Sequence, residues 1–305
     1  MSDSTFRTAV VRTPGGPESI EVIEVPVVEP GPGEIRVRIA AASVNPVDLG
    51  VAEGFFHGMG LINQPERTGL GWDFAGTVVA TGPGVDLAVG TEVAGLVAGF
   101  DRDFGTYAEL IVVPAADVAV VPDGLDLIEA ATVPLNGLTA AQILDLLGSP
   151  AADGNRLLVT GAAGAVGGYL LSLASDRGWR VTGLARADDE EFVRGLGADF
   201  IGHAEPGWDA VADAAALQER SLALVRDGGA FVGVRPGSEP AAERGITVAA
   251  VSVHADGPQL GQLLARTAAG ELPARVQAVL RLDQAADAHR AVAKGGVRGR
   301  YVLRP

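Results

Sequence analysis

Residues 156–168 read Arg-Leu-Leu-Val-Thr-Gly-Ala-Ala-Gly-Ala-Val-Gly-Gly, an apolar strand that runs into glycines and then into the helix-like segment 169–177. A strand that turns on glycines into a helix presents backbone N–H groups and the positive end of a helix dipole, which suit a pyrophosphate. A second apolar segment, 180–185, follows at the spacing of a βαβ unit, and Gly178 ends the helix between them. The stretch therefore predicts a doubly wound α/β domain that binds a dinucleotide.

The glycine turn departs from the usual Gly-x-Gly-x-x-Gly pattern at one position. Ala162 stands at the first glycine, whereas Gly164 and Gly167 keep the positions that allow close approach of phosphate and packing of helix on strand. In a chain with 42 glycines, a strand-to-helix turn of any α/β protein would look similar. The turn by itself thus leaves a purely structural role open.

The end of the second strand indicates which dinucleotide is bound. An NAD site usually has Asp or Glu there to accept a hydrogen bond from the ribose, whereas this chain has Arg186, whose guanidinium can pair with a 2′-phosphate. Asp188 and Asp189 follow closely and suit the start of the next helix. We therefore expect NADPH rather than NADH, with a solvated surface arginine as the alternative for Arg186.

The composition is typical of a two-domain α/β enzyme. The 305 residues suffice for two cores, and 48% of them are hydrophobic. A formal net charge of −15 disfavours nucleic acid and anionic membrane surfaces as partners. Charged residues interrupt the apolar runs, and the first residues lack a basic start and an apolar stretch, so we expect no membrane span, no secretory signal and a cytoplasmic location.

Several kinds of catalytic site are excluded by what the sequence lacks. It has no cysteine, which rules out thiolate catalysis and cysteine-ligated zinc, and its four histidines show no close metal-ligand spacing. Arg290 stands four positions before the single lysine, Lys294, so no Tyr-x-x-x-Lys pair is formed. Serine-elbow and Walker motifs are also missing. The sequence therefore predicts a mechanism that uses no metal.

Two patterns of secondary structure divide the chain. Up to about residue 120, alternating segments and Gly/Pro turns predict a β-rich region. From about residue 128, predicted helices alternate with five buried strands, at 157–159, 181–184, 210–212, 231–234 and 248–253. The end of the chain reads strand (275–282), helix (284–293) and strand (300–303).

Further motifs follow one another in a characteristic order: Asn45-Pro-Val-Asp48, Gly71-Trp-Asp-Phe-Ala-Gly76, Gly105-Thr-Tyr-Ala-Glu109, Ala130-Ala131 with Gly137-Leu-Thr-Ala140, the glycine turn, Leu196-Gly-Ala-Asp199 and Arg298-Gly-Arg-Tyr-Val-Leu303. Over nearly the whole chain this order resembles the zinc-independent quinone oxidoreductase (zeta-crystallin-like) branch of the medium-chain dehydrogenase/reductases. The resemblance implies a GroES-like catalytic domain (1–122 and 275–305) packed on a Rossmann domain (123–274), with NADPH in the cleft. Where zinc-containing relatives carry Gly-His-Glu, this chain has Gly71-Trp72-Asp73.

The resemblance also implies roles for single residues. Asn45 would lie beside the nicotinamide and Asp48 would hold the same loop, although Asn, Pro and Asp also favour turns for local reasons. The implied cofactor contacts are Thr139 near the nicotinamide ribose, Gly161, Gly164, Ala165 and Val166 at the pyrophosphate, Arg186 at the 2′-phosphate, His203 near the adenine, Val234 and Val253 near the nicotinamide, and Arg300 beside the cofactor. For Thr139, His203 and the two valines, the alternatives are a helix hydroxyl, an exposed loop histidine and simple core packing.

Two departures from the branch bear on the mechanism. Gly50 stands where quinone reductases of this branch often have tyrosine or lysine, so a proton donor is missing there, and Ala165 replaces a usual glycine. Tyr107 and His57 remain as candidate donors, with a packed strand residue as the alternative for Tyr107. The apolar, glycine-rich segment 53–62 would cover an aromatic or polyketide-like substrate, or else be a surface loop.

Together these features predict hydride transfer from NADPH to a quinone or an enone. A pathway-specific enzyme on the same scaffold, either an enoyl reductase or a non-redox cyclase, is a second reading, and a non-catalytic NADPH-binding protein is a third. Relatives often pair through the edge of the Rossmann sheet, which would place residues 248–253 at the contact of a homodimer.

Overall fold

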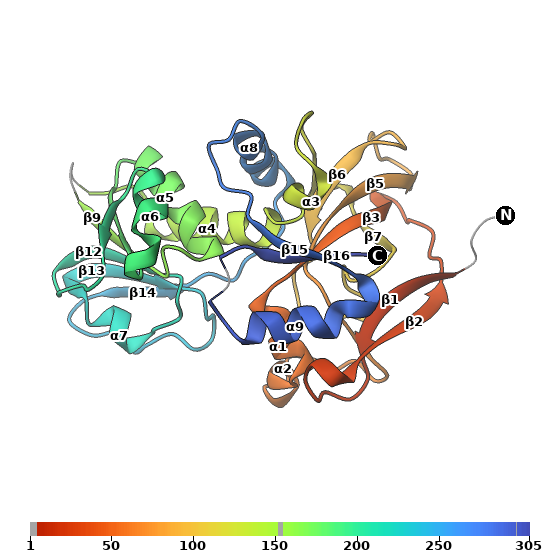
Figure 1. Cartoon of the computed structure of the whole chain (residues 1–305), viewed down its shortest axis with the longest axis horizontal. Helices are drawn as coiled ribbons and strands as arrows, with labels where there is room; N and C mark the ends of the chain where they lie inside the picture. Colours follow the sequence, from red (N-terminus) through yellow and green to blue (C-terminus); the bar gives the residue numbers. More distant parts are fainter. Residues whose placement is uncertain (1–4, 152–154, 297) are drawn as a thin grey trace. The chain divides into compact units, whose positions relative to one another are not determined.

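The computed structural model describes residues 5–151, 155–296 and 298–305 (Figure 1). The chain divides into two compact units, the first made of 1–135, 254–269 and 274–305 and the second of 136–253 and 270–273. Compared with the expected boundaries, 123–135 and 254–269 group with the first unit, where helix α8 (Gly257–Ala268) packs on strand β8 (Val118–Val120). One unit is β-rich and the other holds a parallel sheet, which confirms the predicted fold class.

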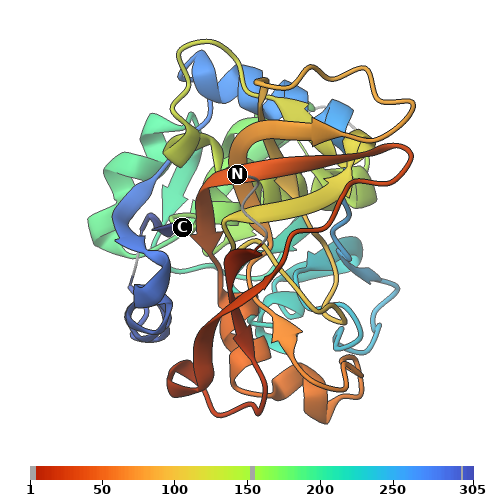
Figure 2. The same cartoon turned by 90° about the vertical axis from the view of Figure 1, so that its right-hand side faces the viewer.

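Two sheets form the first unit, whose antiparallel strands face the viewer in Figure 2. Strands β1 (Thr5–Val11), β2 (Ile20–Pro26) and β4 (Thr68–Gly69) make a small sheet in the order β2-β1-β4. The larger sheet has the order β15-β16-β3-β5-β6-β8, with β7 paired to β3. Its other strands are β3 (Glu34–Val44), β5 (Asp73–Thr81), β6 (Glu92–Leu96), β7 (Leu110–Pro114), β15 (Val276–Arg281) and β16 (Arg300–Arg304).

The end of the chain completes this larger sheet. Strands β15 and β16 flank helix α9 (Ala285–Ala293), which confirms the predicted order of strand, helix and strand. Strand β16 runs antiparallel to β3, with Tyr301 opposite Val44. Residues near the C-terminus are therefore held beside the segment that leads into helix α1 (Pro46–Ala52), and they become part of the first unit.

The alternating sequence of β3 accounts for the core of the first unit. Ile35, Val37 and Ile39 are buried on one face, while Arg36 and Arg38 point away from it, as the two-residue period of a strand requires. Short helices close the ends of the sheet: α2 (Phe55–Gly58) follows α1, and α3 (Leu127–Ala130) packs on β3 and β5.

The second unit is a six-stranded parallel sheet in the order β11-β10-β9-β12-β13-β14. Its strands are β9 (Arg156–Thr160), β10 (Arg180–Leu184), β11 (Asp199–Ile201), β12 (Trp208–Asp213), β13 (Val225–Gly233) and β14 (Thr247–Ala250), and its helices are α4 (Pro134–Leu147), which begins in the first unit, α5 (Ala165–Asp176), α6 (Glu190–Gly195) and α7 (Glu219–Leu222). All five predicted strands are present, whereas β11 was not predicted. Strand β14 lies at the sheet edge and ends before Val253.

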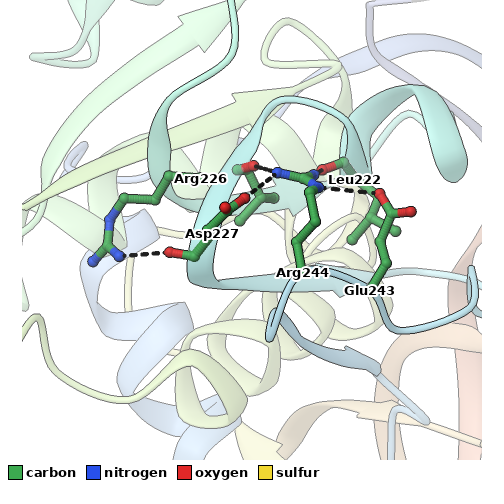
Figure 3. Close-up of polar contacts among 6 residues, drawn as sticks. Leu222, Arg226, Asp227, Glu243 and Arg244 are labelled. Carbon is green, nitrogen blue, oxygen red and sulfur yellow. Dashed lines mark hydrogen bonds and ion pairs between the residues drawn. The ribbon is translucent and has the colours of Figure 1, made fainter.

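The connection from β13 to β14 contains no helix and is fixed by Arg244 (Figure 3). Arg244 has a left-handed φ of 49°, which is unfavourable for a residue with a side chain. Its guanidinium donates to the carbonyl oxygens of Val225 at 2.7 Å and Leu222 at 3.1 Å, and it pairs with Asp227 at 3.1 Å. These contacts hold the loop at the end of the sheet where β13 begins.

Within the described part of the chain, no helix combines the length and the apolar character that crossing a membrane requires.

Candidate functional site

The predicted glycine turn joins β9 to α5 at the carboxyl end of the parallel sheet. Gly161 has a φ of 60°, and Gly164 immediately precedes the 12-residue helix α5. A Cβ atom on Gly167 would lie 2.2 Å from the carbonyl oxygen of Gly161, so only glycine lets the helix approach the turn this closely. Ala165 and Val166 begin α5, whose first N–H groups have no partner within the helix. The predicted pyrophosphate residues therefore lie together at a helix amino end.

A buried pair of side chains, which sequence reasoning missed, supports this turn. Thr160, the last residue of β9, donates its hydroxyl to Asp213, the last residue of β12, over 2.6 Å. The other oxygen of Asp213 accepts from the backbone N–H of Gln218 at 2.8 Å. The order of the sheet reverses between these two strands, and ligands of doubly wound sheets bind at such a reversal. A threonine and an aspartate at neighbouring strand ends were the available signal.

Arg186 lies just beyond β10, at the start of a short 3₁₀ helix (Ala187–Asp189). Its side chain is exposed, and no hydrogen bond or ion pair joins that side chain to another residue in the described ranges. The guanidinium is therefore available to an external anion.

The remaining predicted contacts of the second unit lie at scattered places. The His203 side chain is 83% exposed and lies 3.1 Å from Glu205. Val234 directly follows β13 and Val253 lies three residues beyond β14, both half-buried, while Thr139 is buried within α4. No finding tests their roles, which stay predictions.

Polar side chains from distant parts of the sequence meet inside the first unit. Each is at most 1% exposed: Asn45, Asp48, Asp73, Tyr107 and His289. Hydrogen bonds link them in a chain: the Asn45 side-chain amide donates to Asp73, the Asn45 backbone N–H and the Tyr107 hydroxyl donate to Asp48, and the Tyr107 hydroxyl also contacts His289. The predicted residues Asn45, Asp48 and Tyr107 thus lie in one cluster.

Asp48 holds the loop that precedes α1. Its carboxylate accepts from the backbone N–H of Asn45 at 2.9 Å and of Gly71 at 3.0 Å, and from the hydroxyl of Tyr107 at 3.1 Å. Burial raises the pKa of Asp48 to about 6, although these hydrogen bonds and the charge of Arg102 favour the ionised form. Both carboxylate oxygens are engaged, so Asp48 ties three segments together; a part in catalysis stays a prediction.

Tyr107 lies three residues before β7 and is fully buried. Its hydroxyl is 3.1 Å from Asp48 and 3.4 Å from Nε2 of His289 on α9. Burial and the neighbouring carboxylate of Asp48 raise the pKa of Tyr107 well above its ordinary value, and burial lowers the pKa of His289 to about 4. Whether Tyr107 supplies a proton is not tested and stays a prediction. His57, the other candidate donor, lies 3.2 Å from the hydroxyl of Thr68.

Asp73 is a functional candidate that sequence reasoning missed, since Trp72-Asp73 was read only as the loss of a zinc motif. It begins β5 and accepts from Nδ2 of Asn45 at 2.7 Å and from the backbone N–H of Leu135 at 2.5 Å. Burial raises its pKa to about 7, the charge of Asp48 adds to this, and Arg300 opposes it. Arg300, a predicted cofactor contact, thus acts electrostatically on the same carboxylate.

The structure also explains the missing side chain at position 50. A Cβ atom on Gly50 would lie 2.7 Å from Cε2 of Phe56, whose ring stacks on Phe100 with centroids 4.0 Å apart. Phe56 belongs to α2, within the segment 53–62, where Phe55, Met59 and Leu61 are 44–49% exposed. Trp72 meets Phe100 edge to face, so the aromatic cluster reaches the residue beside Asp73.

Among the described residues, no group of three or more His, Cys, Asp or Glu side chains is arranged to hold a metal ion.

Comparisons with known proteins agree over both units. A family model described as "Alcohol dehydrogenase GroES-like domain" matches residues 31–123, and one described as "Zinc-binding dehydrogenase" matches residues 187–303. Among curated proteins, the trans-enoyl reductase thnE of Trichoderma harzianum is 30% identical over 281 residues, which cover 81% of this chain and 74% of that protein.

Other similar proteins differ more in length or come from solved structures. The pikromycin polyketide synthase component PikAII of Streptomyces venezuelae is 32% identical over 303 residues, 90% of this chain but 8% of that protein. The structure of the quinone oxidoreductase from Coxiella burnetii superposes with a TM-score of 0.87 at 25% identity and covers 99% of both chains. This chain spans about half or less of the length of several curated relatives that it matches.

Proposed function

The chain belongs to the medium-chain dehydrogenase/reductase superfamily, oxidoreductases that bind a nicotinamide cofactor, and on this premise we propose that it is an NADPH-dependent reductase of quinones or activated alkenes that needs no zinc. The single observation that carries the choice of cofactor is Arg186. An exposed guanidinium without an ion pair within the described ranges stands at the strand end where a 2′-phosphate would be read.

Residues of this chain fit the cofactor at several points. The glycine turn lets α5 approach closely, and the first N–H groups of the helix would hold the pyrophosphate. When bound, the cofactor supplies the hydride. Asn45 would orient the nicotinamide or the acceptor with its amide, and Asp48 would keep the Asn45 loop in shape.

The zinc-free reading is supported by what surrounds Asp73. Trp72 takes the place of a potential histidine ligand, and both oxygens of Asp73 already accept hydrogen bonds from Asn45 and the Leu135 N–H. These two donors fix the carboxylate within the chain, so binding a cation would have to compete with its existing contacts. Polarisation of the acceptor oxygen then falls to hydrogen-bond donors of the chain.

An enoyl reductase is a second candidate, favoured by the names of two similar proteins. One is a trans-enoyl reductase and another is a polyketide synthase component. An enoyl thioester is itself an activated alkene, so the two candidates share the hydride step and differ in the acceptor. We also propose a homodimer through the edge strand β14, and a cytoplasmic location, as the sequence predicts.

The test is titration with NADPH and NADH, followed by absorbance assays of cofactor consumption with a benzoquinone, methyl vinyl ketone and a crotonyl thioester. We expect tighter binding of NADPH and consumption with at least one acceptor. Arg186→Ala should weaken NADPH binding about 10-fold or more and leave NADH binding unchanged. Arg194→Ala is the matched control, because Arg194 is also exposed but pairs with Glu190 at 2.8 Å.

Three outcomes would contradict this proposal. Preference for NADH, or unchanged NADPH affinity in Arg186→Ala, would refute the role of Arg186. Tight NADPH binding without consumption of any acceptor would refute the reductase and favour a non-redox or non-catalytic role. A preference for the crotonyl thioester over the quinone would select the enoyl reductase.

A further inference from the structure

The side-chain amide of Asn45 is held from one side by a buried carboxylate. Its Nδ2 donates to Oδ2 of Asp73 over 2.7 Å, and Asn45 and Asp73 are at most 1% exposed. When Asp73 is ionised, a hydrogen bond of this length to its carboxylate, away from water, is of the strong charge-assisted kind. Asn45 stands just before α1 and Asp73 begins β5, so the contact joins the loop before α1 to the large sheet.

This contact determines which way the amide faces. Above its raised pKa, Asp73 is ionised and its carboxylate only accepts hydrogen bonds, whereas an amide has a donor end and an acceptor end. If the Asn45 amide were turned over, its oxygen would face the Asp73 oxygen, and two acceptors would be buried against each other. Asp73 therefore favours one of two orientations that are nearly equal in shape, and the capping box of α1, in which the Asn45 side chain faces the backbone N–H of Asp48, adds to this preference.

Asp73 is itself anchored, so it cannot follow the amide. Its second oxygen, Oδ1, accepts from the backbone N–H of Leu135 at 2.5 Å. The charged groups that act on it are Arg300 on β16, which favours the ionised form, and Asp48 on α1, which opposes it. One carboxylate thus accepts hydrogen bonds from two donors, and through it the position of the Asn45 amide is fixed relative to the Leu135 backbone.

We propose that Asp73 is a positioning residue, whose carboxylate fixes the orientation of the Asn45 amide for the hydride-transfer reaction. The catalytic part of this inference rests on the proposed function, whereas the orientation of the amide does not. Asp73 touches no reacting atom in this role; it acts through Asn45.

The substitution Asp73→Asn tests the idea with little change in shape. An asparagine at this place has one acceptor, so it cannot serve both the Leu135 N–H and the Asn45 amide. If the new asparagine keeps its hydrogen bond to the Leu135 N–H, its own NH₂ group faces Asn45 and the Asn45 amide turns over. If it instead keeps its hydrogen bond to the Asn45 amide, the Leu135 N–H is left without a partner.

Two readouts are needed, and the first is independent of activity. In the wild type, the side-chain amide hydrogens of Asn45 should show slow solvent exchange and a downfield shift by NMR, assigned by their loss in Asn45→Ala. In Asp73→Asn this signature should disappear. If the Asn45 resonances keep their shifts and slow exchange, the proposal is overturned.

The second readout separates positioning from a loss of stability. With the acceptor on which the wild type is most active, Asp73→Asn should lower kcat about 10- to 100-fold and change KM and the NADPH affinity by less than about 3-fold. The matched control is Asp209→Asn, because Asp209 also accepts two hydrogen bonds, from the Arg156 N–H at 2.8 Å and from Arg226 at 2.6 Å.

The Asp209→Asn control shows whether a loss of kcat comes from positioning or from lower stability. Asp209→Asn should lower the melting temperature and leave kcat unchanged, since Asp209 lies near the start of β12, away from the glycine turn. Equal losses of kcat in the two variants would overturn the proposal. A wild type that is inactive on every acceptor would refute the proposed function, and the NMR readout would still decide whether Asp73 orients Asn45.

Discussion

The ring of Phe56 occupies the space that a side chain on Gly50 would take, because a Cβ atom there would lie 2.7 Å from Cε2 of the ring. Phe56 also stacks on Phe100, with centroids 4.0 Å apart and ring planes 27° from parallel. Gly50 and Phe56 therefore depend on each other, and the apolar segment after α1 is packed against the position of Gly50.

This dependence predicts that Gly50→Ala destabilises the protein. The added methyl group must displace the Phe56 ring from its stack on Phe100, at a cost of about 1–3 kcal/mol, which the better helix propensity of alanine within α1 offsets by about 0.5–1 kcal/mol. Gly58→Ala is the matched control, because a Cβ atom there meets nothing within 4 Å and Gly58 lies in the adjacent helix α2. Denaturant unfolding measures both changes.

The double variant Gly50→Ala with Phe56→Leu tests the cause. If the clash is responsible, the second substitution recovers part of the lost stability, and the two changes together cost less than their sum. Additive losses would show that Gly50 is needed for another reason.

Ala216 offers a site where the protein can be stabilised. It has a left-handed φ of 53°, a conformation that costs a residue with a side chain about 1–2 kcal/mol. Glycine removes this strain, but its greater conformational entropy in the unfolded chain offsets part of the gain. We therefore expect Ala216→Gly to raise the free energy of unfolding by about 0.5–1 kcal/mol. Ala215→Gly, at a neighbour without positive φ, should lower it. A loss of stability in Ala216→Gly would contradict the prediction.

The dependence of stability on pH should reveal the buried acid Asp73. Its pKa is raised by burial from 3.8 to about 7. Between about pH 4 and pH 7, Asp73 therefore keeps its proton in the folded protein but has lost it in the unfolded chain. Asp73 therefore makes stability fall as pH rises from about 4 to about 7, by at most ~4 kcal/mol. His289 acts oppositely, because burial lowers its pKa from 6.5 to about 4 and its contribution is lost as pH falls.

Comparison with Asp73→Asn isolates this contribution. The difference in unfolding free energy between wild type and variant should change steadily between pH 4 and pH 7, with the wild type relatively more stable at the acid end. Unfolding in urea at several pH values measures it. A difference that stays constant with pH would show that Asp73 keeps an ordinary pKa.

Sequence reasoning succeeded where a feature is local. The glycine turn, the five strands and the final strand-helix-strand arrangement depend on neighbouring residues and on periodicity, and all are present. Strand β11 was missed because its three residues are too few to show a period. The predicted strand 248–253 ends at Ala250, since its partner β13 ends opposite it at Gly233.

The polar cluster of the first unit could be predicted only in part. Asn45 and Asp48 share one motif and were found together, whereas Asp73 meets them through the antiparallel register of β3 and β5, in which Ala41 lies opposite Ala75. His289 reaches Tyr107 from 182 positions away, through the packing of α9. No pattern in a single sequence encodes such pairings, because the topology of the sheet sets them.

The pair formed by Tyr107 and His289 should behave as a unit in a double-mutant cycle. The Tyr107 hydroxyl donates to Asp48 and accepts from Nε2 of His289, so removing one partner leaves a buried polar atom on the other. Tyr107→Phe and His289→Leu should each lower the free energy of unfolding by about 1–3 kcal/mol. The loss of unfolding free energy in the double variant should be smaller than the sum of the two single losses by about 0.5 kcal/mol or more, because the double variant leaves no imidazole without a partner. Urea unfolding of the four proteins gives the coupling, and strictly additive losses would show that the 3.4 Å contact contributes nothing.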